Sequence, residues 1–283
     1  MPQLICTVRG CALPLEVRGS VARCPRAHAY DRARSGYWNL LQPADRRSPD
    51  AGDRPEAIAA RRRWLDRGHA EGLVELVARA ARLDRLSPGG VVADVGCGDG
   101  WFAERLLAGR GFDLVGVDLS ADAVRLAARR MPGSTWVVAN ADRCLPLATA
   151  AADVALSIFG RRPAAELARI VRPRGRLLVA APGEDDLAEI REAALGRAVR
   201  RGRDRIEVER LEQAGFEVEA SESWSRRVAH DRAAVDDALA MSYRGARRSE
   251  RARLDARLGT EGRLDVTLAV EIVVFVRRGS GTP

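Results

Sequence analysis

The sequence predicts an α/β protein in which a mostly parallel, seven-stranded sheet is covered by helices, with a small cysteine-rich module ahead of it. Three observations predict this fold. Strand-like and helix-like segments alternate from residue 91 onward, a glycine-rich loop follows the first of these strands, and three cysteines and a histidine gather in residues 1–35. Alternating apolar strands and helices are typical of a parallel sheet covered on both faces.

Short apolar runs give five strands at 91–95, 114–117, 136–139, 154–159 and 176–181. Helices are expected from about 101, over 121–130 and 164–171, and from about 184. Two longer strands, 216–228 and 264–276, close the sequence around a polar helical stretch. A long strand pair at the end of an open α/β sheet is unlike the usual half of a dinucleotide dehydrogenase.

Residues 55–86 are expected to form one helix, because Pro55 suits a first helical position and apolar residues recur at spacings of three and four. Gly68 and Gly72 are the positions where this helix would bend. Residues 36–54 read as an irregular connector, since Pro43, Pro49 and Gly52 prevent a long regular element. The expected division is a module at 1–35, a connector and helix at 36–86, and a large domain at 87–283.

The net charge of the 283-residue chain is +8, and all 47 basic residues are arginines. Arginine in place of lysine is typical of a GC-rich genome. Residues 1–70 carry 13 arginines against seven acidic residues, which concentrates the charge there and favours a polyanion partner over a merely solvated surface. The sequence has no apolar run of membrane-spanning length and no leader pattern, so a soluble cytoplasmic protein is expected.

The loop Asp94–Gly100 (DVGCGDG) lies between a predicted strand and a predicted helix. Glycines let the backbone pass close under a ligand, and the start of the helix offers free N–H groups. A nicotinamide dinucleotide fingerprint needs a third glycine at position 101, where Trp101 stands instead, so an oxidoreductase is excluded. The G-x-G-x-G pattern suits S-adenosylmethionine (SAM), which has no pyrophosphate.

A second acidic residue strengthens this interpretation. Asp118 ends the next strand, 22 residues after Gly96, where a carboxylate accepts both ribose hydroxyls of a nucleoside. Asn140-Ala141-Asp142 follows the third strand and is expected to contact the adenine edge. The expected cofactor-binding residues are Asp94, Gly96, Cys97, Gly98, Asp118, Leu119, Asn140, Ala141 and Asp142. Cys97 and Cys144 are expected to be packing cysteines rather than nucleophiles.

The N-terminal module has metal-ligand spacing. Cys6-x4-Cys11 is followed by Cys24-x3-His28, which makes a tetrahedral zinc site plausible. About 30 residues are too few to bury a core alone, so the metal would supply folding energy. The alternative is a set of reduced, unligated cysteines. Five cysteines in the whole chain are too few for a disulfide scaffold.

Over nearly its whole length the chain resembles the large-subunit ribosomal RNA guanine-N1 methyltransferases of the RlmA and TlrB type. The resemblance rests on the zinc cluster, His28–Asp31, Gly36–Leu41, Ala51–Asp53, Ala60–His69 and the loop Asp94–Gly100. It implies a class I SAM-dependent methyltransferase fold, a zinc domain that contacts RNA, and often a homodimer. The implied activity is methylation of guanine N1 in a hairpin loop of 23S rRNA, and relatives in antibiotic producers confer macrolide resistance.

Two departures from the family pattern bear on the target base. The first cysteine pair has four intervening residues rather than two, and Phe159-Gly160-Arg161-Arg162-Pro163 replaces a small aromatic-proline motif after the fourth predicted strand. Phe159, Arg161, Arg162 and Trp38 are candidate stacking platforms for an unstacked base. Asp53, Asp66 and Phe159 are the candidate catalytic residues, the two acids as proton acceptors. The alternative for both acids is helix capping or a local salt bridge, and His69 is expected to pair with Asp66.

Two other functions stay open. One is a methyltransferase that acts on another RNA or on a small molecule, against which the charged zinc module argues. The other is a non-catalytic RNA-binding or regulatory protein with this fold, against which the intact Gly96, Gly98 and Asp118 argue. Binding of SAM by the purified protein separates the second from the enzymes.

Overall fold

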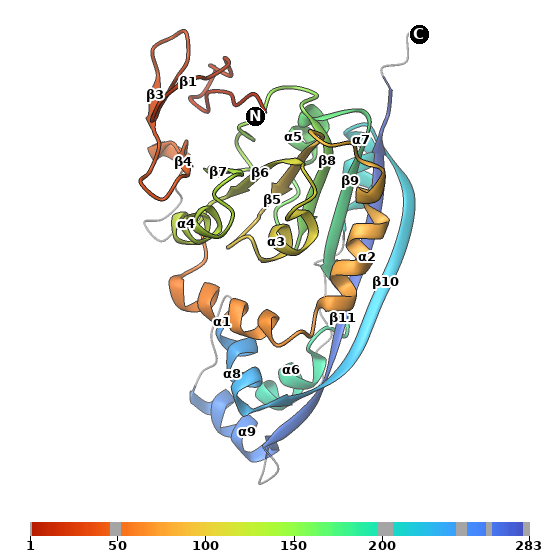
Figure 1. Cartoon of the computed structure of the whole chain (residues 1–283). Helices are drawn as coiled ribbons and strands as arrows, with labels where there is room; N and C mark the ends of the chain where they lie inside the picture. The colour runs from red at the N-terminus through yellow and green to blue at the C-terminus, as the bar shows by residue number, and fades with distance from the viewer. Residues whose placement is uncertain (1, 46–51, 197–205, 242–247, 259–261, 280–283) are drawn as a thin grey trace.

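A computed structural model describes residues 2–45, 52–196, 206–241, 248–258 and 262–279. Its main feature is an eight-stranded sheet in the order β10-β11-β9-β8-β5-β6-β7-β4 (Figure 1). Strands β4 to β9 run parallel to one another, and β11 pairs antiparallel with both β9 and β10. No helix in the described ranges is long and apolar enough to cross a membrane.

Seven of these strands are those that the sequence predicts. Their bounds are β5 Val91–Val95, β6 Asp113–Asp118, β7 Thr135–Val138, β8 Ala152–Ile158, β9 Val171–Pro182, β10 Phe216–Asp231 and β11 Arg263–Arg277. The eighth is a two-residue strand, β4 (Trp38–Asn39), which pairs with β7 at the edge of the sheet. The expected seven-stranded sheet is therefore extended by one short strand from the connector.

Helices cover both faces of the sheet. One face packs against α5 (Ala164–Ile170) and α7 (Val208–Gln213), and the other against α2 (Glu71–Ala80), α3 (Trp101–Leu107) and α4 (Ala121–Arg130). Alternate residues of each strand serve the two apolar cores: Ala93 and Val95 face one, and Val92 faces the other. The two-sided burial explains why these strands are almost entirely apolar.

The N-terminal module is a small antiparallel sheet of β1 (Glu16–Arg18), β2 (Val21–Arg23) and β3 (Ala29–Asp31). It does not stand apart from the large domain. Leu4 bridges to Leu147, and Leu4, Leu15 and Trp38 belong to the same apolar core as the adjacent face of the main sheet. The module is thus docked on the sheet by burial as well as by backbone hydrogen bonds.

The predicted single helix over 55–86 is wrong. The range contains two helices, α1 (Pro55–Asp66) and α2, and a short 3-10 turn, η2 (Leu83–Arg85), follows α2. Another 3-10 turn, η1 (Pro43–Asp45), lies in the connector ahead of α1. The break between α1 and α2 lies at Gly68, which has a left-handed φ of +79° that a helix interior does not allow. The helix therefore stops at the first of the two glycines and does not merely bend.

A third apolar core lies at the far end of the long β10–β11 pair. Here α1, α6 (Ala188–Leu195), α8 (Arg232–Ala240) and α9 (Arg248–Leu258) gather beyond the ends of the parallel strands (Figure 1). We call these four helices the cap. Trp64 of α1 and Trp101 of α3 are buried in the same core, so the cap packs directly against the helix that follows the glycine loop.

Candidate functional site

The four predicted metal ligands converge in the N-terminal module. The Sγ atoms of Cys6, Cys11 and Cys24 and a ring nitrogen of His28 all lie within 4.8 Å of one another. Two tight turns bring them together, one closed by Cys11 N–H donating to the Val8 carbonyl and one by Cys24 N–H donating to the His28 carbonyl. The four-residue gap between the first two cysteines is therefore accommodated by the turn.

The distances fit a tetrahedral zinc ion. The Cys11 and Cys24 sulfurs are 3.8 Å apart, and His28 Nδ1 lies 3.3 Å from Cys6 Sγ and 3.4 Å from Cys24 Sγ. Zinc bonded about 2.3 Å from each of two sulfurs in a tetrahedron places those sulfurs roughly 3.8 Å apart. A disulfide needs an S–S distance of about 2.05 Å, so these cysteines are not paired with one another.

The surroundings of this cluster suit a bound metal. The Tyr30 hydroxyl lies 3.1 Å from Cys6 Sγ, where it can donate to a thiolate. Burial raises the pKa of Tyr30 to about 12, so the hydroxyl stays a donor well into the alkaline range. The cluster and its outer partner thus have the composition of a structural zinc site.

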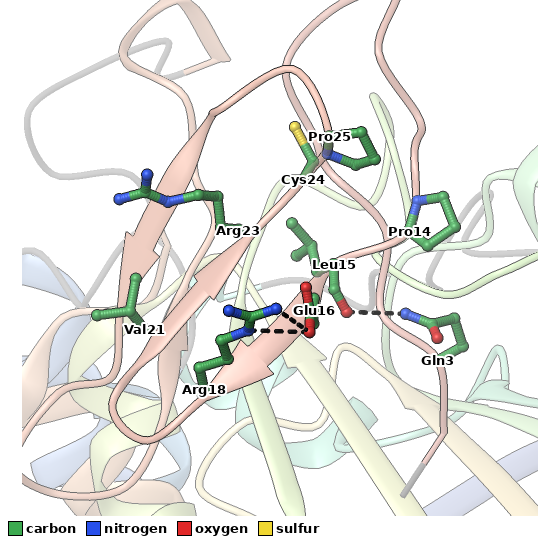
Figure 2. Close-up of a pocket in the computed structure, with 9 residues that line it drawn as sticks. All are labelled: Gln3, Pro14, Leu15, Glu16, Arg18, Val21, Arg23, Cys24 and Pro25. Atoms are coloured by element: carbon green, nitrogen blue, oxygen red, sulfur yellow. Dashed lines mark hydrogen bonds and ion pairs between the residues drawn. The ribbon is translucent and has the colours of Figure 1, made fainter.

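A hollow of about 680 Å³ lies beside the cluster, between the N-terminal segment and the β1–β2 hairpin (Figure 2). Pro14, Leu15 and Pro25 give it apolar walls, and Arg18 and Arg23 stand on the hairpin at its edge. The module also exposes a set of arginines that face solvent: Arg9, Arg18, Arg23, Arg26, Arg32 and Arg34.

The glycine loop leaves the end of β5 with three left-handed glycines. Their φ angles are +82° at Gly96, +55° at Gly98 and +78° at Gly100. A side chain on Gly96 would lie 2.7 Å from the Cα of Gly160, because the loop after β8 passes directly against it. The loop therefore forms a cradle of bare backbone at the carboxyl ends of the strands, where open α/β sheets bind ligands.

Two acidic residues flank this cradle. Asp118, at the end of β6, accepts hydrogen bonds from Gly98 N–H (2.9 Å) and Ser120 N–H (2.8 Å), one on each carboxylate oxygen. Each oxygen keeps a second lone pair for a ribose hydroxyl. Burial raises the pKa of Asp118, and burial together with Asp118 raises the pKa of Asp94 to about 7. Such a paired acidic site suits a cofactor that carries positive charge.

Asn140 and Asp142 lie at the end of β7, next to this site. Asn140 Oδ1 accepts from Asp142 N–H, and its Nδ2 donates to the carbonyl of Asp45 in the connector. Asp142 forms an ion pair with Arg161 in the loop after β8, with a shortest distance of 2.5 Å. Leu119 is partly buried and Ala141 is buried nearby. The structure thus brings all nine predicted cofactor residues to one edge of the sheet.

Neither predicted packing cysteine has the surroundings of a nucleophile. Burial raises the pKa of the Cys97 thiol well above its ordinary value, with Asp118 adding to the effect. Burial also raises the pKa of Cys144 to about 11. Both thiols stay protonated at neutral pH and serve packing.

Phe159 is the residue after β8, and its exposure and backbone conformation bear on the site. Its side chain is 46% exposed, one of three large apolar side chains exposed among the described residues, and its φ is +57°, which non-glycine residues rarely adopt. Its N–H donates to the Ala180 carbonyl, and its ring lies 6.0 Å from that of Phe102. Six other described non-glycine residues also have a positive φ, so what distinguishes Phe159 is its exposed ring next to Gly160, which touches the glycine loop.

The two candidate proton acceptors have different surroundings. Asp53 lies against the end of β6, where its carbonyl accepts from Ser120 Oγ and its carboxylate pairs with Arg61. Asp66 accepts from Trp101 Nε1 (2.8 Å) and from Arg62 and Arg105. Burial acts to raise the pKa of Asp66, but the hydrogen bonds from Trp101 and Arg62 outweigh it and lower the pKa.

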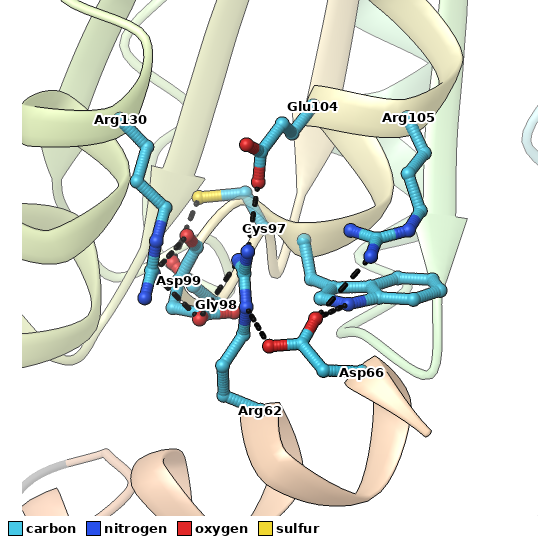
Figure 3. A network of polar contacts seen from close by, with 9 residues as sticks. Arg62, Asp66, Cys97, Gly98, Asp99, Glu104, Arg105 and Arg130 are labelled. Carbon is cyan, nitrogen blue, oxygen red and sulfur yellow. Dashed lines mark hydrogen bonds and ion pairs between the residues drawn. The ribbon is translucent and has the colours of Figure 1, made fainter. Parts of the chain in front are cut away.

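The network around Asp66 was not predicted from the sequence (Figure 3). Arg62 of α1 lies between Asp66 (2.9 Å), Glu104 (3.1 Å) and Asp99 of the glycine loop (3.5 Å). Arg130 of α4 also pairs with Asp99, at 2.7 Å. These contacts attach the cap to the glycine loop, and the run of three arginines at 61–63 was the only signal for them in the sequence.

Two expectations about aromatic side chains are wrong. Trp38 is only 3% exposed because β4 packs it into the core, so its ring is not available as a stacking platform. His69 stacks on His230 at 4.8 Å and does not pair with Asp66. Trp64 Nε1 of α1 donates to Nε2 of the fully buried His230 of β10, so these rings form a packed aromatic cluster between the cap and the end of β10.

Comparisons with known proteins agree with this geometry. Residues 92–177 match the family described as a methyltransferase domain, and residues 5–48 match the zinc ribbon described as the N-terminal part of RlmA. The YcgJ protein of Bacillus subtilis has a TM-score of 0.52 at 13% identity, over 73% of this chain and 98% of its own. A protein of Bacillus halodurans assigned as a methyltransferase has a TM-score of 0.53 at 15% identity, and the match covers 71% of this chain and 98% of that protein. The fold is that of the SAM-dependent methyltransferases, with a zinc ribbon ahead of it.

Relatives in sequence narrow the class. A 23S rRNA (guanine(748)-N(1))-methyltransferase of Streptomyces fradiae is 40% identical over 65% of each chain. A protein of Micromonospora griseorubida, whose assignment as a 23S rRNA guanine-N1 methyltransferase is itself inferred, is 34% identical over 67% of this chain and 69% of its own. The chain belongs to the family of 23S rRNA guanine-N1 methyltransferases. The match spans just under two thirds of the Streptomyces fradiae protein.

Proposed function

We propose that this protein transfers a methyl group from SAM to N1 of a guanine in a hairpin loop of 23S rRNA. The observation that carries the proposal is the presence, in one chain, of a metal-binding arginine-rich module and a SAM-type cradle joined by a connector that contacts the cradle. The similarity to the Streptomyces fradiae enzyme supports the choice of RNA and of atom. The proposed division is a zinc module at 1–35, a connector and helix region at 36–86, and a methyltransferase domain at 87–283.

In this proposal each part of the site has a role. Cys6, Cys11, Cys24 and His28 hold zinc and thereby shape the module. The bound SAM supplies an electrophilic methyl group. Asp118 accepts from its ribose hydroxyls, while Leu119, Asn140, Ala141 and Asp142 border the adenine. Asp94, Gly96, Cys97 and Gly98 form the backbone cradle below it.

The target base must leave its stack, because guanine N1 lies on the Watson–Crick edge. Phe159 is the proposed platform for this base. It is exposed, it is held in a strained conformation, and its neighbour Gly160 touches the glycine loop. Holding the base in line with the methyl group contributes more to the rate than proton transfer does.

Guanine N1 also carries a proton that must leave during the transfer. Asp53 is the proposed acceptor, because among the described residues its carboxylate has one ion-pair partner, Arg61, whereas both oxygens of Asp66 accept hydrogen bonds from α1 and α3. Asp66 is the proposed anchor of the cap. Full turnover in both Asp53→Asn and Asp66→Asn would remove the two residues from the mechanism.

Phosphates of the RNA are proposed to meet the exposed arginines of the module, with the hollow beside Arg18 and Arg23 receiving part of the strand (Figure 2). Such contacts release counterions, so binding should weaken steeply as salt is raised. Affinity that ignores ionic strength would contradict this assignment. The proposal places the protein in the cytoplasm with ribosomal RNA, and the family resemblance adds a homodimer, which analytical sedimentation tests.

The deciding experiment is transfer of labelled methyl from SAM to 23S rRNA that lacks the native modification, followed by nucleoside mass spectrometry. We expect 1-methylguanosine, with the site mapped by reverse-transcription stops. Cofactor binding without any methylated RNA would overturn the proposed substrate. A product on another base would overturn the choice of guanine N1.

A further inference from the structure

Arg61 of α1 lies against the glycine cradle, although α1 belongs to the cap. One of its guanidinium nitrogens is 3.7 Å from the place where a side chain on Gly98 would begin. Its side chain is 33% exposed, and its partner Asp53 is 29% exposed, so the pair is half-buried at the mouth of the cradle. Asp118 lies close enough that both members of the pair influence its pKa.

The segment that carries Asp53 is held closely onto the end of β6. Gly52 has a φ of +96°, and a side chain there would lie 2.9 Å from the backbone of Ser120. Ser120 Oγ then donates to the Asp53 carbonyl at 3.0 Å. Because the backbone on both sides is held in this way, Arg61 faces the cradle from a defined position.

The acidic residues around the cradle match the positive groups of SAM but not its negative one. Asp94, Asp99 and Asp118 suit its positive sulfonium and ammonium groups, but SAM also carries a carboxylate, which needs a cation. The guanidinium groups of Arg62 and Arg130 also reach the loop. Arg130 donates to Asp99 at 2.7 Å. Arg62 donates to Asp66 and Glu104, and its Nη1 lies 3.5 Å from Asp99, beyond a good hydrogen bond. Arg61 already holds a carboxylate at this place, that of Asp53.

We propose that Arg61 binds the carboxylate of the methionine part of SAM, taking it in exchange for Asp53. The inference rests on the proposed function in that it takes SAM as the cofactor. The exchange is a competition between two carboxylates for one guanidinium, and a guanidinium can form two parallel hydrogen bonds to either. When SAM is bound, Asp53 is released from its ion pair.

The test compares two ligands that differ in this carboxylate. S-adenosylhomocysteine carries the amino acid end, whereas 5′-methylthioadenosine lacks it and keeps the ribose and adenine. Both are titrated calorimetrically into the zinc-loaded full-length protein. Arg61→Gln should weaken binding of S-adenosylhomocysteine by about 10- to 100-fold, the range for a hydrogen bond to a charged group, and leave methylthioadenosine within about twofold.

Arg54→Gln is the matched control, because it removes the same charge from an exposed side chain next to Asp53. It should leave both affinities unchanged. Asp53→Asn removes the competing carboxylate and should keep or increase the preference for S-adenosylhomocysteine. The inference would be overturned if Arg61→Gln weakened the affinity for both ligands equally or for neither. It would also be overturned if Asp53→Asn reduced the preference for S-adenosylhomocysteine over methylthioadenosine.

No RNA takes part in this experiment, so its outcome is independent of the substrate. Absence of 1-methylguanosine in the RNA assay would leave a positive result at Arg61 standing. Equal loss of both ligands would in turn leave the RNA proposal intact.

Discussion

The zinc module and the cap are both attached to the main sheet, but their internal structures are organised in different ways. The module consists of three strands of three residues each and is organised around four side chains that meet within 4.8 Å. The cap has a buried core of its own and reaches the glycine loop through ion pairs such as that of Arg62 with Asp99. Metal chemistry sets the geometry of one region and burial sets that of the other, so the two should fail under different treatments.

The largest expected effect is loss of the metal. Cys24→Ser, or removal of zinc by a chelator, should reduce the rate of RNA methylation by at least about 100-fold, because structural zinc contributes on the order of 10 kcal/mol to the folding of such modules. Binding of S-adenosylhomocysteine should survive. The measurements are zinc content, methyl transfer and calorimetry, with Cys144→Ser as the control cysteine outside the cluster. Full methylation by zinc-free protein would contradict the comparison.

Asp118→Asn should produce the opposite pattern. We expect cofactor affinity to fall by about 10- to 100-fold, since a charged acceptor of the ribose hydroxyls is lost. Zinc content and RNA affinity should not change, because the module keeps its ligands. Asp122→Asn, which removes an exposed acid of α4, is the matched control in the same calorimetric titration. A parallel loss of zinc would show that the two regions are not separable.

Phe159→Ala should give a smaller effect at the place where RNA and cofactor meet. Stacking of a base on an aromatic ring is worth about 1–3 kcal/mol, so methyl transfer should slow by about 10-fold or more while cofactor affinity stays constant. Leu195→Ala, at another exposed apolar residue, is the control. The measurement is single-turnover transfer to 23S rRNA, and an unchanged rate would remove Phe159 from the site.

The smallest expected effect is on the acid stability of the cap. Burial, with His230 and Arg67 nearby, lowers the pKa of His69 to about 4 from an ordinary value of 6.5. The unfolded chain takes up this proton below pH 6.5 and the folded chain only near pH 4, so His69 should reduce stability as the pH falls through this window. His69→Phe should recover on the order of 1 kcal/mol there, measured by urea unfolding.

Zinc release also occurs in acid, because its ligands take up protons. The control for the preceding experiment is therefore to follow zinc content at each pH. A pH dependence that persists unchanged in His69→Phe, or that follows the loss of zinc alone, would assign the acid sensitivity to the module and not to the cap.

Local patterns predicted local structure well. The bounds 91–95 and 121–130 agree with β5 and α4, because an apolar run and a serine-capped amphipathic segment carry their own signals. The zinc cluster was predictable for a similar reason, since its ligands lie in two close pairs. The family assignment was confirmed by the relatives.

Contacts between distant segments were not predictable in this way. Trp38 looks like a surface aromatic until β4 pairs with β7, some 100 residues away. His69, in the turn after α1, meets His230 near the end of β10. Asp66 of α1 meets Trp101 only when the cap packs against α3. The short helix α7 was not predicted. It lies in a polar stretch of the sequence, and Leu211 is its buried residue.

Strand β4 has one more consequence. Because the connector donates this strand to the main sheet, the module is joined to the catalytic edge by hydrogen bonds and a shared core and not by a loose tether. A tether raises the local concentration of a bound strand and tolerates many geometries. Under the proposed function, a docked module would hold the RNA at a fixed distance from the cofactor site. RNAs with insertions between the segment held by the module and the target nucleotide should then be poor substrates.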